Sequence, residues 1–180
     1  MMLVRTFILI ALSLALTPAQ MAKPDSNLRE SRSGAAAVKN SWRGITPLRS
    51  SAADVARALG DEVDPSEGQV SGPFKVEGGE VTFSYLTESL AKIYRAPRSM
   101  VGKVFTIYFK PSGAMSRAEL RLAAGFKRCA EERNKLYYYL VNDAGVAYQL
   151  RSDSDIVETI IYQPSRAETQ RLAVMSECIF

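Results

Sequence analysis

The residue types that catalysis needs at neutral pH are sparse in this chain of 180 residues, which contains no histidine. Histidine is the side chain best suited to acid–base chemistry near pH 7 and the commonest metal ligand. Its absence excludes Ser-His and Cys-His nucleophilic sites. The sequence has no phosphate-binding loop of the GxxxxGK type, and Gly78-Gly79 alone is typical of a turn. We therefore expect no cofactor and assign no catalytic residue.

Acidic residues supply the remaining catalytic or metal-binding chemistry. Four of them lie close together in the sequence, at Asp61, Glu62, Asp64 and Glu67. They lack the alternating ligands and the closing glutamate of a calcium loop, so a solvated acidic loop is the better interpretation and no metal site is predicted. Two carboxylates at a suitable separation would be enough for a glycosidase-like reaction, but nothing in the sequence selects such a pair.

A group of basic residues is the strongest candidate for a binding surface. It consists of Lys92, Arg95, Arg98 and Lys103, with Tyr94 among them. A basic, aromatic-containing loop can bind an acidic partner, a glycan or an anionic lipid head group. The alternative is a solvated connection between two strands, which is the usual role of a charged segment.

The two cysteines, Cys129 and Cys178, are the other residues with chemistry of their own. A disulfide between them would close a loop of about 50 residues and stabilise the fold by about 4 kcal/mol in the chain-entropy model. The bridge requires Cα atoms within about 7 Å of each other, which sequence spacing does not establish. Two buried free thiols are the alternative.

The amino-terminal segment has the pattern of a secretory signal peptide. Arg5 is the only charged residue before an apolar run over residues 6–16, and Thr17-Pro18-Ala19 resembles a cleavage site. The run is shorter than the about 20 residues that span a bilayer, so we expect no transmembrane span after processing. We expect a signal peptide over residues 1–19 and a periplasmic or secreted product. A retained membrane anchor is the alternative.

The part that follows divides into a polar leader and one domain. Residues 20–41 carry few large apolar side chains, so they cannot bury enough surface to offset the entropy of ordering, and we expect a flexible leader. Residues 42–180 are near the usual size of a domain with one core. The 23 Lys and Arg are interspersed with 19 Asp and Glu rather than gathered in a stripe, so we expect no nucleic-acid partner.

The hydrophobic pattern of residues 42–180 predicts an α+β fold. Helices are predicted at 50–60, from Ser116 onward and after Pro164, each with a serine cap and an acidic residue three positions later. Continuation of the second helix through residues 126–133 is an open alternative. Alternating apolar residues predict strands at 74–76, 81–85, 103–109, 136–141, 146–150 and 156–162, of which the first has the weakest pattern.

The order of these elements sets the expected architecture. The strands do not alternate regularly with helices, so we expect an antiparallel sheet of about five strands with two to three short helices packed on one face. Within the strand at 103–109, Phe105, Ile107 and Phe109 are expected to share one face. Trp42 is expected to anchor the start of the domain against the core.

Residues 44–60, a serine-capped helix that ends in Leu59-Gly60, resemble the opening of the small SmpA/OmlA-type envelope domains. The resemblance implies an α+β fold with helices against a small antiparallel sheet, and a role as an interaction module in outer-membrane assembly. The chain departs from that family because it has no lipid-attachment cysteine after the apolar run. The Trp42-x-Gly44-Ile45 and Tyr162-x-Pro164-Ser165 segments are also similar to those of exported bacterial proteins of unassigned function.

These features predict an exported, non-enzymatic binding or interaction domain with an envelope or extracellular protein as its partner. Two alternatives stay open: a carboxylate-dependent hydrolase that acts outside the cytoplasm, and a basic module that holds an anionic polymer or a membrane surface. A pocket with two carboxylates would favour the hydrolase, and a flat apolar patch would favour the interaction domain. Salt-sensitive binding to an anionic matrix would favour the basic module.

Overall fold

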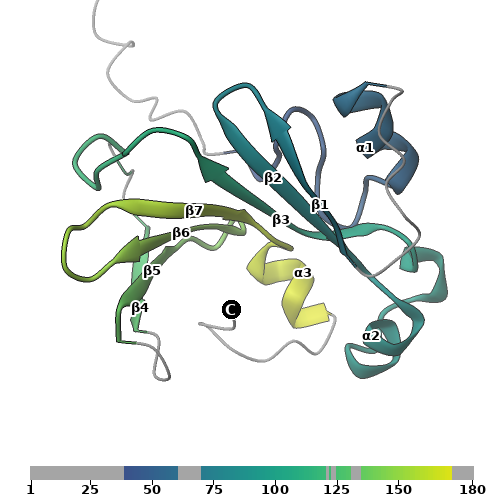
Figure 1. The fold of residues 1–180 in the computed structure, drawn as a ribbon. Coiled ribbons are helices and arrows are strands. Elements are labelled where there is room, and N and C mark those ends of the chain that lie inside the picture. Colours follow the sequence, from purple (N-terminus) through teal and green to yellow (C-terminus); the bar gives the residue numbers. More distant parts are fainter. Residues whose placement is uncertain (1–38, 61–69, 121, 123–124, 131–134, 172–180) are drawn as a thin grey trace, which may run out of the picture. The chain divides into compact units, whose positions relative to one another are not determined.

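The computed structural model describes residues 39–60, 70–120, 122, 125–130 and 135–171. The strands are β1 (Val70–Val76), β2 (Gly79–Tyr85), β3 (Val104–Pro111), β4 (Lys127–Ala130), β5 (Tyr137–Val141), β6 (Val146–Arg151) and β7 (Val157–Tyr162). The helices are α1 (Ala52–Leu59), α2 (Glu88–Ile93), the short 3-10 helix η2 (Arg98–Met100) and α3 (Arg166–Arg171). The seven strands form one antiparallel sheet in the order β1-β2-β3-β7-β6-β5-β4 (Figure 1). The predicted α+β class is confirmed, with more strands than the five expected.

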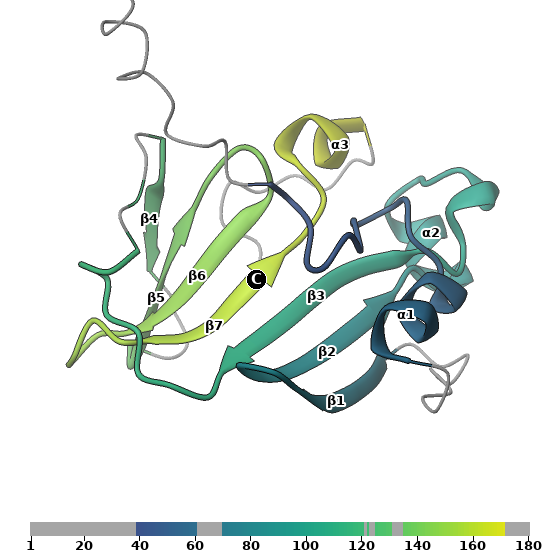
Figure 2. The same ribbon diagram turned by 90° about the horizontal axis from the view of Figure 1, so that it is seen from above.

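Two consecutive groups of strands build this sheet. The first group is β1, β2 and β3, with α2 and η2 inserted between β2 and β3, and the second is the meander from β4 to β7. β7 comes last in the sequence but lies at the centre of the sheet, where Ile161 pairs with Tyr108 of β3 and so joins the two groups. The sheet is strongly twisted, so that β4 stands at a steep angle to β3 when seen from above (Figure 2).

One face of the sheet, which we call the outer face, packs against the amino-terminal part of the domain. Trp42 meets Phe83 edge to face with ring centroids 5.7 Å apart, and both belong to a buried cluster with Val55 of α1. The helix begins where Ser51 and Asp54 form a reciprocal capping box, as its sequence predicts. Trp42 therefore anchors the start of the domain against the core, as expected.

The segment between β3 and β4 covers the outer face of the second group without forming the predicted helix. The Glu119 carboxylate accepts hydrogen bonds from the backbone and hydroxyl of Ser116, which are the bonds expected at a helix start. Residues 117–120 nevertheless form turns, and Leu120 packs into the outer core. Residues 127–130 form strand β4 instead of a continued helix, because pairing with β5 satisfies their backbone groups. A capping box favours one turn and does not guarantee a helix.

The helices do not share one face of the sheet, which corrects the prediction. α1 packs on the outer face, whereas α3 lies on the opposite side, the inner face (Figure 1). α2 lies in a segment that the sequence pattern indicates as a connection. The Thr87 hydroxyl accepts the backbone N–H of Leu90 at its start, and Ala91 is buried against Leu86. Tertiary packing therefore stabilises a helix whose own apolar pattern is too short to detect.

A β-bulge on β3 changes which residues share a face. The register with β2 shifts between Ser84 and Tyr85, which leaves Phe105 as the extra residue. Phe105 therefore turns toward α2, where its ring stacks on Tyr94 with centroids 5.3 Å apart, while Ile107 stays in the outer core. The expectation that Phe105 shares a face with Ile107 and Phe109 is therefore wrong for Phe105, whereas Ile107 and Phe109 do pack in the same cluster.

Candidate functional site

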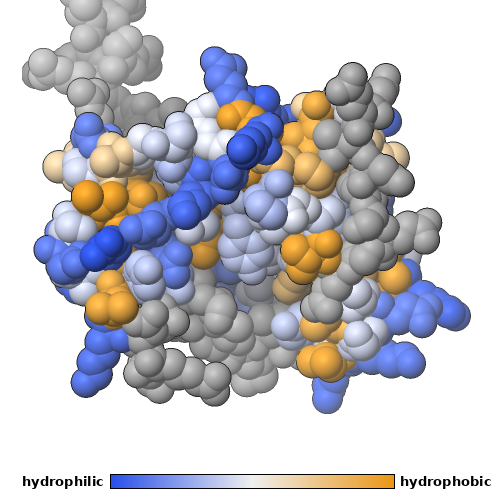
Figure 3. Space-filling view, viewed as in Figure 1, coloured by the Kyte–Doolittle hydropathy of each residue, from blue (hydrophilic) through white to orange (hydrophobic). Residues whose placement is uncertain are grey.

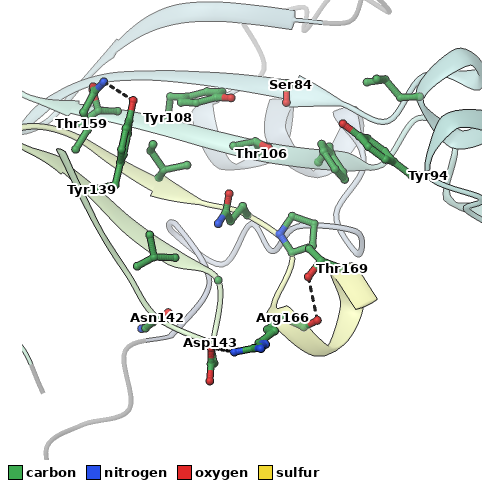
Figure 4. Close-up of a pocket in the computed structure, with 18 of the residues that line it drawn as sticks. Ser84, Tyr94, Thr106, Tyr108, Tyr139, Asn142, Asp143, Thr159, Arg166 and Thr169 are labelled. Carbon is green, nitrogen blue, oxygen red and sulfur yellow. Dashed lines mark hydrogen bonds and ion pairs between the residues drawn. The ribbon is translucent and has the colours of Figure 1, made fainter. Parts of the chain in front are cut away.

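A groove of about 490 Å³, which we call the inner groove, lies on the inner face of the sheet. Its walls come from both groups of strands, as the sticks in Figure 4 show. Leu90 and Tyr94 of the α2 region line one part of it, and Arg166 and Thr169 of α3 line another. A volume in this range fits a small organic ligand.

The middle of the groove is built on one row of side chains that crosses the sheet. The strand register places Tyr108, Ile161, Ala147 and Val141 beside one another on β3, β7, β6 and β5, and Lys127 of β4 ends the row. Alternate residues of a strand point to opposite faces, so a row of paired residues shares the inner face. Ala147 is fully buried at the middle of this row. Because its side chain is a single methyl group, Ala147 rises less far above the sheet than its larger neighbours Ile161 and Val141.

Uncharged hydrogen-bonding side chains flank this row. Those that line the groove include Ser84, Thr106, Tyr139, Gln149, Thr159 and Gln163. Gln149 pairs with Tyr139 on one side and with Thr159 on the other. Its amide Nε2 donates to the Tyr139 hydroxyl at 2.9 Å, which orients both side chains (Figure 4). Three neighbouring strands therefore offer hydroxyl, amide and hydroxyl groups side by side.

Tyr108 is the most accessible aromatic residue among the described residues that line the groove, with 41% of its surface exposed. Burial of the phenol raises the pKa of Tyr108 above 10.0, and the Thr106 hydroxyl partly offsets this rise. The phenol is therefore neutral at pH 7 and can both donate and accept a hydrogen bond. Val70 at the edge of the groove is also exposed. The groove thus combines an open ring with polar groups.

Besides Lys127 on β4, the charged side chains that line the groove lie in the turn between β5 and β6 and on α3. Arg166 donates from Nη1 to Oδ1 of Asp143 at 3.5 Å, and both side chains are well exposed, so the pair contributes little to stability. Asp143 is the only carboxylate among the described residues that line the groove. The described groove therefore offers no pair of carboxylates for a hydrolase.

The structure separates the five basic and aromatic residues predicted as a binding surface. Lys92, Arg95 and Arg98 line one shallow hollow on α2 and η2. Tyr94 lines the inner groove instead. Lys103 is set apart from both, in an isolated bridge to the residue that caps α1. Three of the five residues therefore come together, and Tyr94 belongs to a different site.

Two other predictions involve residues that the structure does not describe. Cys129 is buried on β4 next to Tyr139, but Cys178 lies outside the described residues, so the pairing of the two cysteines stays a prediction. The acidic set at positions 61, 62, 64 and 67 also lies outside them. Within the described part of the chain, no three His, Cys, Asp or Glu side chains gather in an arrangement that could hold a metal ion.

The inner groove is not predicted from the sequence, although part of its signal is visible in the strands. Thr106 and Tyr108 alternate with apolar residues of β3, and Gln149 lies between Tyr148 and Leu150 on β6. Polar residues at every second position usually face water. The pattern therefore indicates the inner face of β3 and of β6, but it does not show that β7 lies between these strands and brings their inner faces together.

The fold and the groove define an α+β domain whose inner sheet face is lined by polar and aromatic side chains. Comparisons of the chain with models of known protein families, with curated proteins and with solved structures found no match. The likeness of residues 44–60 to SmpA/OmlA-type domains therefore stays a prediction. Among the described residues, no helix combines the length and the apolar character needed to cross a membrane.

Proposed function

We propose that this protein is exported and works outside the cytoplasm as a non-enzymatic binding domain, with the inner groove as its ligand site. The observation that carries the proposal is the groove of about 490 Å³ in which an open tyrosine ring lies among uncharged donors and acceptors. Concave sites with mainly apolar walls and a few convergent polar groups are the usual form of a ligand site. The expected envelope or extracellular protein partner remains part of this proposal.

The chemistry of the lining favours an uncharged ligand with both apolar and hydroxyl or carbonyl groups. The Tyr108 ring and the side chains of Ile161 and Val141 offer apolar contact. Gln149 and Thr159 offer groups that can donate or accept hydrogen bonds to a ligand. The charged side chains among the described lining residues lie at the ends of the groove, with the ion pair of Asp143 and Arg166 at one end and Lys127 on β4 at the end of the central row, so a charged group at the centre would have no opposite charge beside it.

The same geometry argues against the carboxylate-dependent hydrolase. That reaction needs two carboxyl groups roughly 5–10 Å apart on either side of the scissile bond. Asp143 has no second carboxylate beside it among the described lining residues, and it is engaged with Arg166. Binding without covalent chemistry is therefore the function that these residues support best.

A fluorescence titration with the uncharged dye N-phenyl-1-naphthylamine tests the groove as a ligand site. Wild-type protein should bind the dye, and Tyr108→Ala should weaken binding about tenfold because it removes the open ring. Ser84→Trp should weaken binding further by placing an indole in the groove. Leu136→Ala, which removes an exposed apolar side chain outside the set of lining residues, is the matched control and should bind like the wild type.

Equal dye affinity in the wild type, Tyr108→Ala and Ser84→Trp, with far-ultraviolet circular dichroism unchanged, would refute the groove as the site. Export is tested separately by mass spectrometry of the protein recovered from the expressing cell. The expected chain begins at Gln20, after removal of residues 1–19. An intact Met1 on protein from the cytoplasm would contradict export.

A further inference from the structure

The second surface with a distinctive chemistry lies on α2 and η2, away from the inner groove. Lys92, Arg95 and Arg98 line a shallow hollow there. Ile93 does not line the hollow, but it follows Lys92 in α2 and is exposed like it. We call Lys92, Ile93, Arg95 and Arg98 the α2 surface. Figure 3 shows hydrophilic side chains projecting around apolar groups at this end of the molecule.

The charge of the α2 surface is only partly compensated. Arg98 contacts Glu88 at 3.4 Å, but the two side chains are 90% and 64% exposed, so this pair is weak and easily exchanged for another partner. Glu88 is the only carboxylate among the described residues that line the hollow. Three cations against one carboxylate leave two positive charges, which fits a partner with many negative charges spread over a surface.

Ile93 distinguishes this surface from a purely basic patch. The residue is 68% exposed, the largest value among the exposed large apolar side chains that the structure describes. Basic side chains beside an exposed large apolar side chain are the pattern of a segment that lies at a membrane interface, where the apolar group enters the boundary of the acyl chains. A soluble polyanion offers no apolar layer for Ile93 to enter.

The backbone at Arg95 provides a second, independent observation. The amide of Ala96 donates to the Ala91 carbonyl at 2.8 Å and that of Arg95 to the Lys92 carbonyl at 3.3 Å, so α2 ends in a Schellman motif. Arg95 occupies the left-handed position of this motif, with φ of 53°, where glycine is the usual residue. A cation therefore lies at a position where glycine would be less strained.

We propose that the α2 surface docks on an anionic membrane. Lys92, Arg95 and Arg98 contact the phosphate groups of the lipid heads, and the neighbouring Ile93 enters the membrane interface. Each cation close to an anionic bilayer is worth about fivefold in affinity, so removal of two should weaken binding on the order of 25-fold. This site is separate from the inner groove, and the proposal does not depend on what the groove binds.

Co-sedimentation with lipid vesicles tests the proposal. The full chain should bind vesicles of phosphatidylcholine with about 30% phosphatidylglycerol and not vesicles of phosphatidylcholine alone. Every variant is made in the full chain, so any lipid binding by residues 1–19 is common to all and the differences report the α2 surface. Raising the salt from about 0.1 M to about 1 M should release the protein, because the Debye length falls from ~10 Å to ~3 Å.

Three variants of the α2 surface and one control variant identify the residues responsible for vesicle binding. The double variant K92Q/R98Q should bind anionic vesicles on the order of 25-fold more weakly. K75Q/K110Q is the matched control: it removes two exposed cations at the hairpin end of β2, where Glu80 pairs with both residues, and should stay within about twofold of the wild type. Ile93→Ser should weaken vesicle binding several-fold and leave binding to soluble polyphosphate unchanged.

Arg95→Gly separates lipid binding from folding. It should weaken vesicle binding about fivefold without lowering the melting temperature, because glycine adopts the left-handed conformation freely. Wild-type affinity in K92Q/R98Q would overturn the proposal. Equal binding to neutral and anionic vesicles would also overturn it. So would an Ile93→Ser variant with unchanged vesicle affinity, which would indicate a soluble polyanion as the partner.

Discussion

Gly145, in the turn between β5 and β6, is a position where a single added methyl group should destabilise the domain. The residue has φ of 91°, and its carbonyl accepts the backbone N–H of Gln163 at 2.8 Å. A Cβ atom there would clash with the carbonyl oxygen of Gln163 and lie 2.9 Å from Nδ2 of Asn40 and 3.0 Å from the carbonyl carbon of Pro164. The turn is therefore pressed against the end of β7 and the start of α3.

Two effects add up in the expected cost of Gly145→Ala. An L-residue in the left-handed region costs about 1 kcal/mol or slightly more. Overpacking against backbone atoms, which cannot rotate away, costs about 1–3 kcal/mol. The free energy of unfolding should therefore fall by about 2–4 kcal/mol. Urea unfolding followed by the fluorescence of Trp42, the only tryptophan, measures this change.

Gly102→Ala is the matched control, because Gly102 has φ of 80° but no neighbouring atom within 4 Å of an added Cβ. This variant should carry the conformational cost alone, about 1 kcal/mol. The difference between the two variants then reports the clash at Gly145. If Gly145→Ala and Gly102→Ala lose the same stability, the close packing of this turn against Gln163 is refuted. Gly145→Ala should also weaken dye binding, since Gly145 and Gln163 both line the inner groove.

Three further predictions follow from individual hydrogen bonds and from burial. Asp54→Ala should cost about 1 kcal/mol at about pH 7, because its carboxylate accepts bonds from the N–H and hydroxyl of Ser51. These bonds lower the pKa of Asp54 below 3.8, so their stabilisation is fully present above pH 3.8 and is lost as the pH falls through the lower pKa of the folded state. Urea unfolding at about pH 2 should therefore show a smaller difference in stability between the wild type and Asp54→Ala. Tyr138→Phe should lower the free energy of unfolding in urea by about 1–2 kcal/mol, because it removes the hydroxyl that donates to Oδ1 of Asp155 at 2.6 Å. In a double variant with Asp155→Asn, the two losses of stability should not add up. In a spectrophotometric titration, the difference in phenolate absorbance between the wild type and Tyr108→Phe should show one phenol that ionises above pH 10.0. A midpoint below pH 10.0 would contradict the partial burial of the Tyr108 hydroxyl.

The elements that the sequence predicts correctly are those with complete local signals. Ser51 and Asp54 cap α1, and Ser165 and Glu168 make the same arrangement before α3. The hairpin of β5 and β6 follows from two apolar runs around a turn that ends in Gly145. In each case the residues that determine the structure lie within a few positions of one another, so one window of sequence contains the whole signal.

The features that the sequence does not predict depend on distant partners. Strand β4 has a sequence compatible with a helix and becomes a strand because β5 offers it an edge. Phe105 leaves its expected face because β2 pairs with β3 through a bulge. The groove requires Tyr108 and Ile161 to be neighbours, although 53 residues separate them in the numbering. Periodicity identifies the faces of a strand but not the strand that lies next to it.

The basic residues illustrate the same limit on a smaller scale. Lys92, Arg95 and Arg98 are close in sequence and close in space, since α2, the turn after it and the start of η2 hold all three. Tyr94 is inside the same stretch of sequence but points to the inner groove, because the helical turn places it on another side of α2. Sequence proximity alone did not separate these two sites.

The central position of β7 in the sheet has a consequence for how the domain folds. Until residues 157–162 insert as β7, β3 and β6 each have an unpaired edge, and the two groups of strands are not joined into one sheet. Open edges of this kind invite pairing with other chains. A chain that stops before residue 157 should therefore aggregate rather than form a smaller working version of the domain. Ligand recognition by the groove thus becomes possible only after residues 157–162 have been synthesised and paired with β3 and β6.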